Sequence, residues 1–198
     1  LAAGYQYPDT EIGCIYATGS NNCYMEKTAD VNRPAAIINM ECGAFNKLAP
    51  SSWDVKLDEA SEKPGEQRLE KMVSGRYMGE LLSLIVKELL NLSENPNFNA
   101  IDMSNIMADT TATAMDAAKV ISAKAGALEP GEAACIRDVT EAIAVRSARL
   151  VATSFTGTLW HTQGNGPHND GVRGRKRGCL FRGKQSGAQG IQRDFHPA

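Results

Sequence analysis

Residues 17–26 read ATGSNNCYME and lie between two short apolar runs, 12–16 (IGCIY) and 35–40 (AAIINM). Both runs are rich in isoleucine and are bounded by turn-forming residues, which predicts a strand on each side of a polar turn. Thr18 and Gly19 are small, so an anion such as phosphate can approach the backbone N–H groups of the turn closely. The same residue types also dominate ordinary hairpin turns, and the stretch alone admits both interpretations.

The composition is that of an ordinary globular protein. The chain has 198 residues, 42% of them hydrophobic, and a mean hydropathy of −0.30, enough for one sizeable core or two small ones. No apolar run approaches the roughly 18 residues that span a bilayer, and no leader-like segment opens the sequence, so we expect no membrane partner. The five cysteines are scattered without Cys-x-x-Cys spacing, which predicts reduced thiols, a cytoplasmic location and no metal site.

Charge divides the chain into two parts. Residues 162–198 hold 7 Lys/Arg against 2 Asp/Glu, whereas residues 1–161 hold 14 against 21. Apolar periodicity also disappears beyond Thr162. We therefore expect residues 1–161 to be part of one large domain and residues 162–198 to be a basic, Gly/Arg-rich tail that is poorly ordered or divergent. The RGRKRG run at 173–178 suggests phosphate contacts with a nucleic acid. Aromatic residues that could stack on bases are not interleaved with these arginines, apart from Phe181, so a solvated tail is the preferred interpretation.

Helical periodicity begins near Glu66, after a long polar loop over 46–66 in which 53–59 forms one turn of helix. The predicted helices are a pair over 66–92 broken near Gly75, two shorter helices over 101–108 and 112–125, and a long helix over 131–161. The inward residues predicted for the long helix are Ile136, Val139, Ile143, Leu150 and Ser154. Strands followed by helices predict a layered α/β or α+β arrangement, with helices covering a sheet.

Four polar residues lie at the ends of these elements: Asn21, Glu41, Gln67 and Glu70. Gln67 and Glu70 are three residues apart and would share one helix face. Amides donate and accept hydrogen bonds while carboxylates accept them, so the set suits a ligand with many hydroxyls. In the alternative interpretation, Glu70 only complements the helix dipole and Glu41 is a loop carboxylate.

Three motifs in the stretch from Glu11 to Leu90 resemble the hexokinase family of ATP-dependent sugar kinases. ATGSNNCYME is similar to the family's second phosphate segment, Gly-Thr-Gly-x-Asn followed by a small residue and Cys-Tyr. IINMECGAF (37–45) resembles Ile-Asn-Met-Glu-Trp-Gly-Ala-Phe. LDEASEKPGEQRLEKMVSGRYMGEL (57–81) resembles the segment that contains Asn-Pro-Gly-x-Gln-x-x-Glu-Lys-Met.

The resemblance implies the large domain of a ribonuclease-H-like α/β fold, of the actin and hexokinase type, with a mixed sheet covered by helices. It implies ATP-dependent phosphorylation of a hexose at its primary hydroxyl, with ATP and Mg²⁺ as cofactors. It implies that Thr18 and the backbone near Gly19 contact the ATP phosphates. It also implies that Asn21, Glu41 and Glu70 hydrogen-bond the hydroxyls of the hexose, with Gln67 in the same pocket.

The sequence also departs from the family pattern. Ala17 replaces the first glycine of the phosphate segment, and Cys42 replaces a tryptophan. The family's catalytic Asp, in an Asn-Asp-Thr motif, is expected upstream of Leu1, in an N-terminal part that would complete the enzyme. We therefore expect these residues to form an inactive fragment of a hexose kinase, or alternatively an inert sugar-binding or regulatory relative. The nearest candidate for an adenosine segment is 177–181.

Overall fold

A computed structural model describes residues 10–26, 35–163 and 180–181. Within these ranges the strands are β1 (Ile12–Tyr16), β2 (Ser20–Glu26), β3 (Ala36–Asn39) and β4 (Leu180–Phe181). β2 pairs antiparallel with both β1 and β3, with Ile12 opposite Tyr24 and Cys23 opposite Asn39, while β4 pairs parallel with β1. The order β3-β2-β1-β4 is therefore a mixed sheet, as predicted.

The polar turn is shorter than predicted. Only residues 17–19 form the bend, and Ser20–Glu26 is strand β2. The asparagines that suggested a longer turn are held in the strand by side-chain hydrogen bonds. Asn21 Nδ2 donates to Asn39 Oδ1 (2.8 Å), and Asn22 Nδ2 donates to Ser154 Oγ (2.7 Å).

The α-helices follow the predicted order with shifted ends, and the short 3₁₀ helix η1 was not predicted. They are η1 (Cys42–Ala44), α2 (Ser52–Glu59), α3 (Arg68–Val73), α4 (Gly75–Leu89), α5 (Ala100–Ala108), α6 (Met115–Ala125) and α7 (Glu132–Thr162). The break predicted near Gly75 falls at Ser74, whose backbone is extended (φ −75°, ψ 150°). Gly75 then begins α4 and donates its N–H to the Ala17 carbonyl (2.8 Å), which ties the start of the helix to the polar turn.

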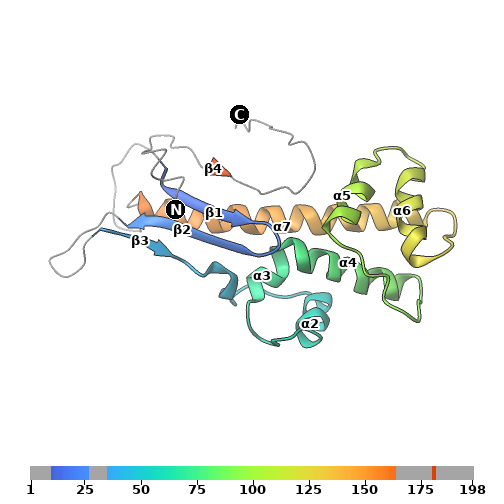
Figure 1. The fold of residues 1–198 in the computed structure, drawn as a ribbon, viewed down its shortest axis with the longest axis horizontal. Helices are drawn as coiled ribbons and strands as arrows, with labels where there is room; N and C mark the ends of the chain where they lie inside the picture. Colours follow the sequence, from blue (N-terminus) through green and yellow to red (C-terminus); the bar gives the residue numbers. More distant parts are fainter. Residues whose placement is uncertain (1–9, 27–34, 164–179, 182–198) are drawn as a thin grey trace.

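Helix α7 runs the length of the molecule and joins two hydrophobic cores (Figure 1). At one end it packs on the sheet and α3 around Ile12, Met72 and Phe155. At the other end it packs on α4, α5 and α6 around Leu82 and Ile136. The polar turn lies where the sheet meets α3 and α4, close to the junction of the two cores.

The inward face of α7 was predicted only in part. Ile136 and Ile143 are buried as expected, whereas Val139, Leu150 and Ser154 are only half-buried. The buried stripe is Ala133, Ile136, Thr140, Ile143, Ser147, Val151, Phe155 and Thr158. Hydroxyl side chains can be buried in this stripe because they donate hydrogen bonds to backbone carbonyls. Thr140 donates to the Ile136 carbonyl within α7 (2.7 Å), and Ser147 donates to the Val73 carbonyl of α3 (2.7 Å).

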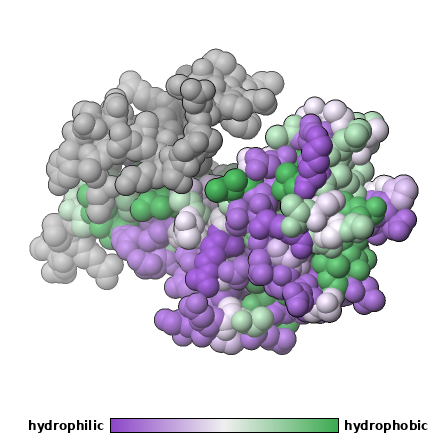
Figure 2. Space-filling model, turned by 45° about the vertical axis from the view of Figure 1, so that its right-hand side comes forward, coloured by the Kyte–Doolittle hydropathy of each residue, from purple (hydrophilic) through white to green (hydrophobic). Residues whose placement is uncertain are grey.

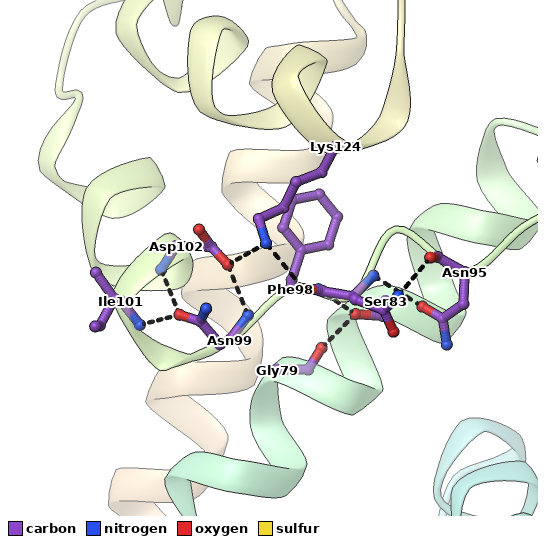
Figure 3. A network of polar contacts seen from close by, with 9 residues as sticks. Gly79, Ser83, Asn95, Phe98, Asn99, Ile101, Asp102 and Lys124 are labelled. Atoms are coloured by element: carbon purple, nitrogen blue, oxygen red, sulfur yellow. Dashed lines mark hydrogen bonds and ion pairs between the residues drawn. The ribbon is translucent and has the colours of Figure 1, made fainter.

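A polar network fixes the approach of α4 to the start of α5 (Figure 3). Ser83 Oγ donates to the Gly79 carbonyl (2.8 Å) and accepts the Phe98 N–H (2.7 Å). Asn99 caps α5, and Lys124 of α6 pairs with Asp102 (3.1 Å). The backbones come so close that a Cβ at Gly79 would lie 2.5 Å from the Phe98 carbonyl oxygen.

Gly79→Ala is therefore expected to destabilise the fold by about 1–3 kcal/mol, since the obstructing atom belongs to the backbone and a methyl group forces α4 and α5 apart. Urea denaturation measures the change. Gly157→Ala is the matched control, because a Cβ there meets no atom within 4 Å and alanine favours the helix by about 1 kcal/mol relative to glycine. Equal stability of the two variants would contradict the close packing.

The surface over the helices mixes hydrophilic and hydrophobic residues (Figure 2). Ile101 of α5 and Met115 of α6 are well exposed, which is common on folded proteins and implies no site by itself. Within the described ranges no helix combines the length and apolarity that a membrane crossing needs. Residues 164–179 and 182–198 of the predicted tail, with its basic run and most of the adenosine candidate, lie outside the described residues, so that division of the chain stays a prediction.

Candidate functional site

Two strands and the segment after them bring Asn21 and Glu41 together through a third residue, Asn39. Asn21 Nδ2 donates to Asn39 Oδ1 (2.8 Å), and Asn39 Nδ2 donates in turn to Glu41 Oε1. Asn21 and Asn39 project from the same face of the sheet, because Asn39 pairs with Cys23, two residues along β2. The three side chains therefore form one hydrogen-bonded row at the edge of the sheet beside the polar turn.

Gln67 and Glu70 approach the same place from the start of α3. The carboxylate of Glu70 accepts a long hydrogen bond from the Ser20 N–H (3.5 Å). A Cβ built on Gly43 would lie 2.6 Å from Gln67 Oε1 and 3.3 Å from Glu70 Oε2, and one built on Gly19 would lie 3.6 Å from Glu70 Oε2. Both side chains thus occupy the space left by two glycines, next to the row formed by Asn21, Asn39 and Glu41.

Gln67 is not in the helix, contrary to the prediction that it shares a helix face with Glu70. It precedes Arg68 with a left-handed backbone (φ 51°, ψ 43°), and its side chain makes no capping hydrogen bond. Glu41 has the same conformation (φ 48°, ψ 44°) before η1. Such a conformation costs about 1 kcal/mol or more for residues other than glycine, and it is found preferentially at functional sites.

The hydrogen bonds already made determine what each side chain can offer to a ligand. Asn21 Oδ1 accepts the backbone N–H groups of Asn22 (2.8 Å) and Cys42 (3.2 Å), so the side chain is left with one of its two amide hydrogens to donate. Glu41 is exposed and uses one oxygen for Asn39, while Glu70 is half-buried. The site therefore combines an amide donor with two carboxylate acceptors, a set that suits hydroxyl groups.

The turn at residues 17–19 can admit a phosphate. Thr18 is exposed at its tip, and Gly19 has no side chain to block the backbone. Ala17 is not among the described residues with positive φ. It donates its N–H to the Gly19 carbonyl (2.9 Å), and its own carbonyl accepts the Gly75 N–H (2.8 Å). The alanine that replaces the family's glycine is thus accommodated without strain. Among the described residues, the buried Ser20 Oγ has no hydrogen-bond partner.

Buried polar contacts support the site from behind. Tyr16 and Ser147 are joined through their hydroxyls, and Asn22 is joined to Ser154, so the sheet is fixed to α7 on either side of the turn. Burial raises the pKa of Tyr16 and of the Cys42 thiol. Cys42, at the position of the family's tryptophan, is therefore a neutral, half-buried wall residue whose backbone N–H holds Asn21.

Contacts group five of the six predicted residues: Asn21 and Glu41 through Asn39, Gln67 and Glu70 beside Gly43, and Gly19 beside Glu70. Thr18 is exposed next to Gly19 in the turn. Sequence reasoning missed Asn39 and Gly43. Asn39 is a polar residue inside the apolar run 35–40, and this exception to the strand pattern was a usable signal. Among the described residues there is no cluster of three or more His, Cys, Asp or Glu arranged to hold a metal ion.

Comparison with known proteins points to one family. The sequence model of the family described as Hexokinase matches residues 11–181. Rat Hexokinase-2 is 33% identical over 189 residues, covering 83% of this chain and 20% of that protein. Human Hexokinase-3 is 40% identical over 102 residues, covering 46% and 11% respectively. The chain thus spans about a fifth or less of these relatives.

Solved structures agree. A hexokinase crystal structure superposes with a TM-score of 0.68 at 29% identity, covering 78% of this chain and 36% of that one. Schistosoma mansoni hexokinase, solved in complex with glucose, superposes with a TM-score of 0.72 at 23% identity, covering 82% and 42%, and shows likeness of fold alone. The family match reaches residue 181 and so extends into the tail, where the motifs had indicated no resemblance. The fold is the predicted α/β fold of hexokinases, and the chain belongs to the hexokinase family.

Proposed function

We propose that the protein containing this chain transfers a phosphoryl group from ATP to the primary hydroxyl of a hexose. The observation that carries the proposal is the convergence of Asn21, Glu41, Gln67 and Glu70 beside the turn at 17–19. Family membership supports the reaction class, and the glucose in the Schistosoma mansoni hexokinase structure makes glucose the first hexose to test.

In this proposal the chain binds and orients the sugar. The free amide hydrogen of Asn21 donates to one hydroxyl, while the carboxylates of Glu41 and Glu70 accept from others. Carboxylates accept strong hydrogen bonds from hydroxyl groups, and a ligand without those hydroxyls would leave the acceptors unpaired. Holding the sugar in one orientation next to the phosphate turn is the main contribution that a kinase makes to phosphoryl transfer.

The turn would hold the phosphates of ATP through the Thr18 hydroxyl and the backbone near Gly19. Thr18 is exposed, and Gly19 is half-buried beside Glu70. Mg²⁺ bound with the nucleotide neutralises phosphate charge during the transfer. We place the general base outside the 198 residues, as the family resemblance implies. The described cysteines, Cys14, Cys23, Cys42 and Cys135, form no disulfide, which suits the cytoplasmic location that we also propose.

A coupled assay of the full-length protein with ATP, Mg²⁺ and glucose tests the reaction, and calorimetry of glucose binding tests the site. We expect hexose-dependent ADP formation, and we expect 6-deoxyglucose to bind without being phosphorylated because it lacks the acceptor hydroxyl. Glucose binding without phosphorylation would identify an inert sugar-binding relative instead. Lack of binding to any hexose would overturn the proposal. Turnover by the 198 residues alone would show that the base lies within them.

A further inference from the structure

Lys71 carries a buried charge for which the proposed reaction has no direct use. It lies on α3 next to Glu70, and its side chain is only 5% exposed. The ammonium group contacts the carboxylate of Asp58, at the end of α2, and donates to the backbone carbonyl of Lys63 (2.7 Å). A buried ammonium group requires partners of this kind, so its contacts define a fixed geometry.

Asp58 holds the same turn from its other side. Its Oδ2 accepts the Gly65 N–H (2.8 Å), and its backbone carbonyl accepts the Ser61 hydroxyl (2.6 Å). Burial raises the pKa of Asp58, but the hydrogen bonds from Lys71 and Gly65 outweigh it and leave the pKa below its ordinary value. The carboxylate therefore stays charged at neutral pH. The turn at residues 60–66 is thus fastened at residue 63 by Lys71 and at residue 65 by Asp58.

This turn leads directly into Gln67. Gly65 has a left-handed backbone (φ 83°), and Gln67 has one too, so the path of the chain into the site depends on how the turn is held. The Gln67 carbonyl also accepts the Lys71 N–H (3.0 Å). The side chain of Gln67 is not used to cap α3 and lies instead beside Gly43, next to the carboxylate of Glu70.

Stability alone does not account for the ion pair. Replacing a buried pair by apolar residues of similar volume is often neutral or stabilising, because desolvation offsets the attraction of the charges. Apolar side chains, however, make no hydrogen bond to the Lys63 carbonyl or the Gly65 N–H. The distinctive contribution of Lys71 and Asp58 is therefore to fix the backbone before Gln67.

We propose that Lys71 is a positioning residue for hexose binding: together with Asp58 it holds the turn at 60–66 so that Gln67 faces the ligand. The role rests on the proposed function, because it presumes that Gln67 contacts the hexose. It implies that the effect of Lys71 on affinity passes through Gln67, whereas a purely structural role would act independently of that side chain.

A double-mutant cycle in the full-length protein tests this role, with glucose as the probe. We expect Lys71→Met to raise the KM and Kd for glucose about 10-fold, with little change in kcat or in the KM for ATP, and to have almost no further effect in a Gln67→Ala background. Lys124→Met is the matched control. It also removes a partly buried ammonium group, from the pair with Asp102, and should leave glucose affinity unchanged (Figure 3).

Additive effects of Lys71→Met and Gln67→Ala would overturn the positioning role, as would unchanged affinity in Lys71→Met. If Gln67→Ala and Glu70→Gln both bind glucose normally, the hexose site itself is wrong, which distinguishes failure of the proposed function from failure of this inference. Should Lys71→Met not fold, Asp58→Asn loosens the same turn from α2 and enters the same cycle. Its additivity with Gln67→Ala would count equally against the role.

Discussion

Glu70→Gln is expected to weaken glucose binding by roughly 10- to 150-fold, since a hydrogen bond to a charged group contributes about 1.5–3 kcal/mol and about 1.4 kcal/mol corresponds to tenfold in affinity. Glutamine keeps the size of the side chain but replaces one acceptor oxygen by a donor. Glu70 faces the Ser20 N–H and the space beside Gly43, so the loss falls on the ligand side of α3. Calorimetric titration of the full-length protein with glucose measures the affinity.

Glu66→Gln is the matched control for Glu70→Gln. Glu66 is a carboxylate four residues earlier, with a side chain 65% exposed and a loose pairing to Lys63 (3.9 Å). Its replacement should leave both glucose affinity and stability unchanged, because an exposed pair of this kind contributes little. Similar losses in the two variants would indicate a general electrostatic effect of negative charge, and normal binding by Glu70→Gln would contradict the site.

The order of strands β1 to β3 and of helices α2 to α7 could be predicted because each of these elements carries its own local signal. Strand β4 was not predicted, since it lies in the expected tail and consists of two residues only. The apolar period of four in 77–89 specifies α4, and Asn99 and Asp102 provide a capping box for α5. The interior of α7 was less predictable. Hydroxyl residues such as Thr140 and Ser147 look like surface residues in the sequence, yet they are buried because hydrogen bonds to backbone carbonyls satisfy them.

The candidate site was predicted as a set of residues but not as a geometry. Motif resemblance identified Asn21, Glu41, Gln67 and Glu70, whereas their convergence depends on contacts far apart in the sequence. The left-handed backbones of Glu41 and Gln67 leave no trace in the residue types, since glycine and asparagine are the residues that usually adopt them. Asn39 acquires its bridging place only from the pairing of β2 with β3.

The substitution of Ala17 for the family's glycine illustrates a limit of motif reasoning. A methyl group is unfavourable there only if the backbone needs positive φ, and this turn has none at that position. Residues 17–19 are instead held from both sides, by the hydrogen bond from Ala17 to Gly19 and by the one from Gly75 to Ala17. A departure from a glycine motif therefore has consequences only through the dihedral angle and the close contacts of that particular residue.

Gly43→Ala is expected to reduce glucose affinity by roughly 10- to 100-fold, comparable to the loss of one or two ligand hydrogen bonds. Gly43 is buried, and a Cβ there would lie 2.6 Å from Gln67 Oε1 and 3.1 Å from Glu70 Cβ. The Gln67 amide is the end of a flexible side chain, so it can rotate away at a cost of about 1 kcal/mol. Glu70 Cβ must also shift slightly, so we expect a small loss of stability, less than in Gly79→Ala. Calorimetry with glucose and urea denaturation measure the two effects.

The comparison with Gly79→Ala separates affinity from stability. At Gly79 the new methyl group meets a backbone carbonyl, whereas at Gly43 it meets mainly the side chain of a ligand residue. Gly79→Ala should therefore lose stability while its folded molecules bind glucose normally. Gly43→Ala should instead lose glucose affinity and keep most of its stability. Gly157→Ala adds the same methyl group in open space and should alter neither binding nor packing. Normal glucose affinity in Gly43→Ala would mean that Gln67 and Glu70 do not bind the sugar from the positions they occupy beside this glycine.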